Sequence, residues 1–420
     1  AMGRSALVAN TTASNNVAAG KSALAANTTG ANNVVIGESA GLAATTSTGN
    51  VVIGQEAVKT GAFTGFNNVV IGKLAGEDLT SADANVIIGE DAGKNQTTAD
   101  NNVLIGQGAA EANLTGANNV AIGNLALAAN TTASDNVSVG QTSLMANTTG
   151  TGLTVLGTAA GRFNTTGNNN TYLGMNSGYT NVTGTQNVAV GHSALNLNTT
   201  NNNTAVGFYA LRVNTTGTGN ASLGYASLDA NTTGSNNTAI GSDSLTTNTT
   251  ASSNSAFGAN ALAANTTGYD QTAAGYRALT TNTTGFRNTA FGSDSLLLNT
   301  TGYDNSAFGK SALQDNTVGE ANTGLGNYAL ANNTTSDFST AVGYQALFTN
   351  TTGANNVAVG KDCLLLNTTA SNNTAMGAFS LKANTTGTAN VAIGNDCMDS
   401  NTTGSKNTAV GTDALQANTT

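Results

Sequence analysis

The sequence predicts an all-β fold, a parallel β-solenoid (β-roll) of about 24–25 coils with a 17-residue repeat. Glycine recurs from Gly3 to Gly411, and 22 of the 24 intervals are 17 residues long, with one of 18 and one of 16. The residue before each of these glycines is apolar in all 24 complete coils. Because so short a repeat cannot bury its own apolar side, each coil must stack on its neighbours.

We number each coil from its glycine, position 1; the coil from Gly20 to Ile36 is typical. Positions 14–17 are rich in β-branched residues, so we expect a short strand there, at residues 33–36 in this coil. We expect positions 15 and 17 to face inward and position 16 to face outward, since side chains alternate along a strand. Ile122, at position 17, is then a core residue whose change to Asp unfolds several coils.

The second half of the predicted core comes from positions 4 and 5. Position 4 is Ala, Ser or Cys in all 25 coils begun, and position 5 is Leu in 17 of them. A small residue at position 4 suits a narrow core, and the glycine at position 1 suits a corner with positive φ or a close backbone approach. A helical solenoid needs about 30 residues per repeat, and Asn-Thr-Thr-Gly interrupts any helical period.

The chain is expected to form one continuous solenoid over residues 1–420, a rod of roughly 115–120 Å at ~4.8 Å per coil. It starts and stops within repeats, which favours a piece of a longer fibre. Residues 37–106 diverge because the Asn-Thr-Thr element is lost there and position 16 is large and apolar. If position 16 faces outward, it forms an apolar stripe, which we interpret as an interface with another subunit or protein; the alternative is a strand buried on both faces within one subunit. The stripe comprises Val35, Val52, Val70, Ile87 and Leu104.

The Asn-Thr-Thr element places a glycosylation sequon at position 8 in 20 coils. Equivalent asparagines are only ~4.8 Å apart along the stack, too close for a sugar on each. We therefore favour a ladder of hydrogen-bonded amides, with glycosylation as the alternative. The residues named for this ladder are Asn10, Asn27, Asn130, Asn147, Asn265 and Asn384. A second run of asparagines, at position 14, is read as a structural corner.

Composition and motifs favour no catalytic, cofactor or metal site. The net charge of −9 disfavours nucleic acid, and no apolar run approaches the ~18 residues of a membrane span. His192 is the only histidine and is expected on a solvated turn. Cys363 and Cys397 lie two coils apart, about 9.6 Å along the stack, beyond disulfide reach. We expect a non-enzymatic protein.

Asn-Val-Ala-Ile-Gly at 119–123 and 390–394, and Asn-Thr-Ala-Val-Gly at 203–207 and 407–411, carry a resemblance. The chain resembles the head repeats of YadA-like trimeric autotransporter adhesins, and the Asn-Thr-Thr-Gly-rich repeats of bacteriophage tail fibres and bacterial surface proteins. The resemblance implies a β-roll, often with three chains side by side. YadA-type head repeats are about 14 residues long, whereas these have 17.

These features together predict an extracellular structural fibre or shaft segment, at a cell surface or on a virion. Self-association as a trimer or filament is the expected partnership, with host-surface glycans as a further partner. One alternative is a filament subunit that stacks end to end. The other is an ice- or carbohydrate-binding solenoid, suggested by the threonine pairs, although only one threonine of each pair should be displayed.

Overall fold

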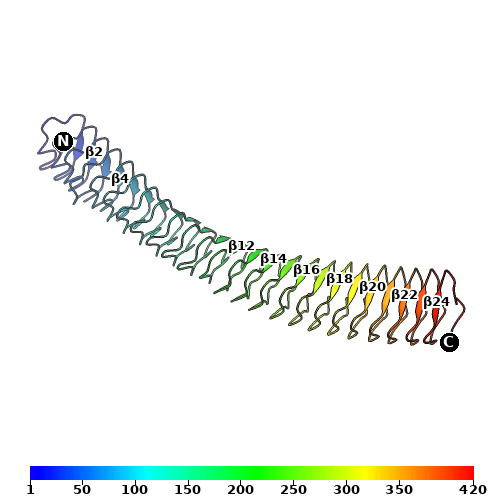
Figure 1. Cartoon of the computed structure of the whole chain (residues 1–420). Coiled ribbons are helices and arrows are strands. Elements are labelled where there is room, and N and C mark those ends of the chain that lie inside the picture. The colour runs from blue at the N-terminus through cyan, green and yellow to red at the C-terminus, as the bar shows by residue number, and fades with distance from the viewer. The chain divides into compact units, whose positions relative to one another are not determined.

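The computed structural model describes all of residues 1–420 and confirms the all-β parallel β-solenoid with its 17-residue repeat. It contains 24 three-residue strands, at positions 15–17 of successive coils, and no helix. The chain divides into two compact units, unit 1 over Ala1–Tyr209 and unit 2 over Ala210–Thr420. Within each unit the strands follow one another along a stack of coils (Figure 1).

The strands of unit 1 are β1 (Val17–Ala19), β2 (Val34–Ile36), β3 (Val51–Ile53), β4 (Val69–Ile71), β5 (Val86–Ile88), β6 (Val103–Ile105), β7 (Val120–Ile122), β8 (Val137–Val139), β9 (Thr154–Leu156), β10 (Thr171–Leu173), β11 (Val188–Val190) and β12 (Thr204–Val206). Those of unit 2 are β13 (Ala221–Leu223), β14 (Thr238–Ile240), β15 (Ser255–Phe257), β16 (Thr272–Ala274), β17 (Thr289–Phe291), β18 (Ser306–Phe308), β19 (Thr323–Leu325), β20 (Thr340–Val342), β21 (Val357–Val359), β22 (Thr374–Met376), β23 (Val391–Ile393) and β24 (Thr408–Val410).

Within each unit, strands of adjacent coils pair in parallel with equivalent positions side by side. Val34 pairs with Val51 in the regular register. The 18-residue coil keeps this register, because Val51 pairs with Val69, and so does the 16-residue coil, because Val188 pairs with Thr204. The turns therefore accommodate the additional residue of the 18-residue coil and the residue that the 16-residue coil lacks, and the strand register does not shift.

The side chains of each strand point in the opposite directions to those expected from the sequence, which placed positions 15 and 17 inward and position 16 outward. Position 16 points inward: the five residues of the expected outward stripe, Val35, Val52, Val70, Ile87 and Leu104, are at most 2% exposed. Position 17 points outward, as Ile36 at 40% exposure illustrates. The stripe is therefore wrong as an interface, and so is the inward assignment of Ile122. The inward residues of this segment are positions 14 and 16, so alternation forces 15 and 17 out.

Size compensation inside the core explains why the side chain at position 16 of the coil varies in size. Where position 5 is glycine, a large position 16 residue of the same or the preceding coil fills the space: a side chain on Gly93 would meet Leu104 Cδ1 at 2.9 Å and Ile87 Cδ1 at 3.3 Å. Tyr172 fills the space beside Gly161 and Gly178 in the same way. Positions 5 and 16 thus share one core, in which glycine at position 5 makes room for a larger side chain at position 16.

Positions 4 and 5 lie in the core, as expected from the sequence. Leu24, Leu127 and most of their equivalents are fully buried, although each adopts a positive φ, 52° and 56° for these two. A left-handed residue other than glycine costs roughly 1–2 kcal/mol. Burial of a leucine side chain stabilises by about 1.5–3 kcal/mol, which offsets that strain.

Tyr172 makes the stability of unit 1 sensitive to high pH. Its buried hydroxyl accepts a hydrogen bond from Asn181 Nδ2 at 2.7 Å, and burial raises the pKa of Tyr172 above its usual value of 10.0. The unfolded chain ionises this tyrosine near pH 10, while the folded chain holds its proton, so the free energy of unfolding falls as pH rises above about 10. Urea melts from pH 8 to 11 should show this fall. In Tyr172→Phe the free energy of unfolding should depend less on pH over this range. An equally steep fall in the variant would contradict Tyr172 as its cause.

Candidate functional sites: an asparagine ladder and an apolar sheet face

The asparagines at position 8 form a buried ladder of side-chain amides. Asn130 Nδ2 donates to Asn113 Oδ1 of the preceding coil at 2.8 Å, and Asn147 Nδ2 donates to Asn130 Oδ1 at 3.2 Å. Each also donates within its own turn, as Asn130 does to the carbonyl of Ala133 at 3.0 Å. Every rung therefore joins two coils and also pins its own corner.

The structure places all six asparagines named from the sequence in such rungs. Asn27 donates to Asn10 at 3.3 Å, Asn265 donates to Asn248 at 3.0 Å, and Asn384 donates to Asn367 at 2.9 Å. Asn10, in the first coil, is exposed, whereas the other five are fully buried. A glycan on any of these five amides would replace one of the two bonded Nδ2 hydrogens and would have to fit inside the packed core, so folded coils cannot accommodate it there.

The ladder is continuous in unit 2 and interrupted in unit 1. In unit 2 it runs without a break from Asn214 to Asn418. In the divergent coils of unit 1 the same core space holds the buried apolar side chains of Ala44, Phe63 and Leu79. Gln96 resumes the polar ladder, because its Oε1 accepts from Asn113 Nδ2 at 3.3 Å.

The asparagines at position 14 form a second, differently bonded ladder. The Oδ1 of Asn33 accepts from the backbone N–H of Asn50 at 3.0 Å, and its Nδ2 donates to the carbonyl of Ser47 at 2.8 Å. The side chain replaces a strand hydrogen bond at the corner where the backbone turns out of the sheet. Position 14 is thus a structural corner that also links neighbouring coils.

Removal of one rung should weaken unit 2 measurably. Asn265→Ala removes the acceptor of Asn282 Nδ2 at 3.0 Å and the donor to Asn248 Oδ1 at 3.0 Å. Leaving these buried groups unpaired should cost on the order of 1–3 kcal/mol. Thermal melts followed by circular dichroism should show a lower midpoint for Asn265→Ala. The control Thr267→Ala, at an exposed position, should leave the melt unchanged; equal midpoints for the two variants would disprove the role of the rung.

The two threonines of each Asn-Thr-Thr element have different roles. The first is half-buried and its hydroxyl donates to the equivalent carbonyl of the next coil, as Thr28 Oγ1 does to Thr45 at 3.2 Å. The second, such as Thr29, is exposed at a bend rather than on a strand. Only one threonine per coil is therefore displayed from this element.

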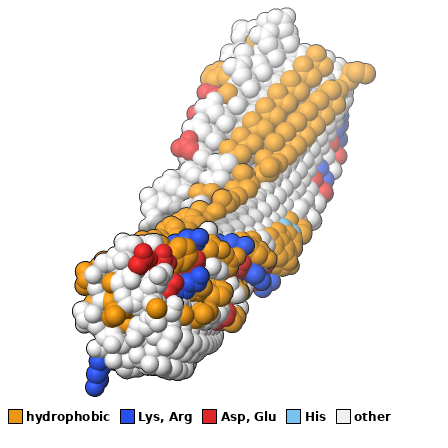
Figure 2. Space-filling view, turned by 90° about the vertical axis from the view of Figure 1, so that its right-hand side faces the viewer, with side chains coloured by type: hydrophobic (Ala, Val, Ile, Leu, Met, Phe, Trp, Pro, Cys, Tyr) orange, Lys and Arg blue, Asp and Glu red, His pale blue; other side chains and the backbone are white.

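The outer face of the sheet carries two rows of side chains, positions 15 and 17, and none of the 24 strands contains a charged residue. Both rows in unit 1 are mainly apolar, Val followed by Ile in β2 to β7. In unit 2, position 15 is mostly Thr or Ser, and position 17 stays apolar, with Phe257 42% and Leu325 48% exposed. Figure 2 shows these hydrophobic side chains gathered in rows along the stack.

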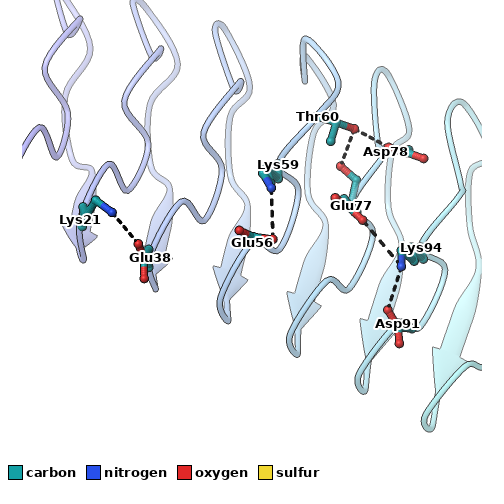
Figure 3. Close-up of polar contacts among 9 residues, drawn as sticks. All are labelled: Lys21, Glu38, Glu56, Lys59, Thr60, Glu77, Asp78, Asp91 and Lys94. Atoms are coloured by element: carbon teal, nitrogen blue, oxygen red, sulfur yellow. Dashed lines mark hydrogen bonds and ion pairs between the residues drawn. The ribbon is translucent and has the colours of Figure 1, made fainter.

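Charged residues lie on the turns, where they pair between coils or along one turn. In unit 1, Lys21 Nζ lies 2.7 Å from Glu38 Oε1, and Lys94 Nζ lies 3.3 Å from Asp91 Oδ1 (Figure 3). The hydrogen bond from Lys21 lowers the pKa of Glu38. Lys21 and Glu38 occupy position 2, two residues beyond the outward position 17, so they border the apolar face.

The remaining candidate residues do not assemble into a reactive site. His192 stacks on Phe208, with ring centroids 5.1 Å apart. Cys363 and Cys397 are free, buried thiols, and burial raises the pKa of Cys363 to about 12. No group of three or more His, Cys, Asp or Glu side chains is placed to hold a metal ion. No helix has the length and apolarity needed to cross a membrane.

Comparisons with known proteins assign no family to the chain. A scan against protein-family models finds no match. A search of curated proteins also finds none that matches. The buried asparagine ladder and the apolar sheet face are therefore the two features from which a function can be inferred.

The outward face is the feature that sequence reasoning missed. The signal was present in the sequence as the inverse size relation between positions 5 and 16, for example Gly93 with Leu104 and Leu127 with Ser138. Ser138 is a polar residue at position 16, and its partner inside the core is also polar. Its hydroxyl lies 2.7 Å from that of Ser143, a position 4 residue, so two serines replace the usual apolar contact.

Proposed function

We propose that this chain is a shaft segment of an extracellular structural fibre, such as a phage tail fibre or bacterial surface adhesin, and that it is not an enzyme. The observation that carries this proposal is the unbroken asparagine ladder of unit 2, from Asn214 to Asn418. Pulling two coils apart there breaks the strand pairing together with buried amide bonds at positions 8 and 14. A stack joined in this way resists extension along its axis, which is what a shaft requires.

The threonine hydroxyls and surface ion pairs add to this coil-to-coil linkage. Thr232 Oγ1 donates to the carbonyl of Thr249 at 3.0 Å, and its equivalents repeat this bond along unit 2. Arg277 pairs with Asp294 of the next coil at 2.7 Å. Exposed pairs contribute little individually, about 0–1 kcal/mol, so the backbone hydrogen bonds between coils and the buried amides carry most of the linkage.

The experiment that tests the proposal is localisation in the source organism. Antibodies raised against the folded chain should label thin fibres on the outside of intact cells or on virions in immuno-electron microscopy. Cells that have been permeabilised provide the control for internal antigen. Label that appears only after permeabilisation, or that lies on no fibre, overturns the proposal.

A further inference from the structure

The outer face of unit 1 is an apolar surface that the chain itself leaves uncovered. On strands β2 to β7, six consecutive valines at position 15 and six isoleucines at position 17 form two parallel rows. The side chain between them on each strand is buried, so the rows are the entire outward surface of the strands. The rows comprise Val34, Val51, Val69, Val86, Val103 and Val120, with Ile36, Ile53, Ile71, Ile88, Ile105 and Ile122.

Such a face is unusual for an isolated chain. Parallel sheets are ordinarily covered on both faces, and this face carries no charged residue that would favour contact with water. Unit 1 has its charged residues on the bordering turns instead: Lys21 with Glu38, and Lys73 with Glu90, whose charged groups lie 3.2 Å apart. An apolar centre with a polar, ion-paired rim is the anatomy of a protein interface.

The dimensions of the face fit a second copy of the chain. The six strands β2 to β7, at ~4.8 Å each and three residues at ~3.3 Å, give a strand surface of about 300 Å² per copy. The other six strands of unit 1, whose outward residues are also mainly apolar, extend it to about 600 Å². Residues of the bordering turns bring this close to the roughly 800 Å² per partner of a standard interface. Two copies also share the same spacing between side-chain rows, so the ridges of one face fit the furrows of the other at every coil.

We propose that the Val–Ile face of unit 1 is a self-association surface, covered by the same face of a second copy of this chain. The proposal builds on the structural-fibre proposal by naming its partner and the residues that bind it. Interdigitated β-branched side chains exclude water from both faces. The bordering charged turns stay in solvent and keep the assembly soluble.

The experiment measures the oligomeric state of the full chain by analytical ultracentrifugation over a range of concentrations. The wild-type chain should assemble, and the double variant Ile36→Asp, Ile88→Asp should shift the assembly midpoint at least 100-fold or remain monomeric. The matched control Thr132→Asp, Thr149→Asp adds the same charge at exposed positions of unit 1 away from the strands. This control should assemble as the wild type does.

Circular dichroism establishes whether the variants fold. If the aspartate double variant does not fold, the milder pair Ile36→Thr with Ile88→Thr replaces it, because threonine keeps the β-branched shape. Ile71→Cys should in addition form a disulfide between copies under mild oxidation, whereas Thr132→Cys should not. A wild-type chain that stays monomeric, or folded variants that assemble unchanged, overturns this inference and leaves the fibre proposal intact. Assembly through this face by a protein found inside cells overturns the fibre proposal alone.

Discussion

Gly89→Ala is expected to destabilise unit 1 by on the order of 3–5 kcal/mol, through backbone strain and a clash with the next coil. Gly89 has φ +137°, and a Cβ built on it would lie 2.5 Å from the carbonyl oxygen of Gly106. The obstructing atoms are backbone, so no side-chain rotation relieves the contact. The stack must separate locally at this corner. Urea denaturation followed by circular dichroism should show a markedly lower midpoint.

Gly41→Ala is the matched control for this result. Gly41 also has a positive φ, +56°, but a Cβ there would meet only side-chain atoms, of which the nearest are Val35 Cγ1 at 3.3 Å and Leu24 Cδ1 at 3.6 Å. Ala110 occupies the equivalent position of another coil with φ 47°, so the backbone accepts alanine at this site. Gly41→Ala should therefore change stability much less than Gly89→Ala. Similar losses for both variants would show that the coil corner at position 1 has no special requirement for glycine.

Ile87→Asp is expected to unfold the coils around β5, whereas Ile88→Asp should leave them folded. Ile87 is fully buried, and a carboxylate in its place would face Gly93 and the apolar core with no partner. Burying an unpaired charge costs several kcal/mol, which exceeds what a few coils supply. Ile88 lies on the outer face, where water reaches the substituted side chain.

The two neighbouring variants test the orientation of the strand directly. Hydrogen–deuterium exchange should show lost protection across β4 to β6 for Ile87→Asp and retained protection for Ile88→Asp. At the same time, Ile88→Asp should lower self-association, since it lies on the Val–Ile face. The reverse pattern, with loss of structure from Ile88→Asp, would restore the orientation first expected from the sequence.

Much of the fold follows from the sequence because the repeat leaves few alternatives. A 17-residue period, with apolar residues at fixed positions and Asn-Thr-Thr-Gly in each coil, is too short for helices and requires stacking. The strand location at positions 15–17 and the small residue at position 4 follow from this spacing. The asparagine rungs follow too, because equivalent residues in stacked coils lie one strand spacing apart, within reach of an amide–amide bond.

Local sequence did not determine which side of each strand faces the core. Val34, Val35 and Ile36 are all apolar, so their alternation gives no direction, and the largest residue of the three lies outside. The tertiary structure decides: Asn33 is buried at the corner, so by alternation Val35 also points into the core while Val34 and Ile36 point outward. Leu24 likewise occupies a left-handed conformation that its propensity disfavours. It does so because burial against the neighbouring coils outweighs local strain, an interaction that no single coil contains.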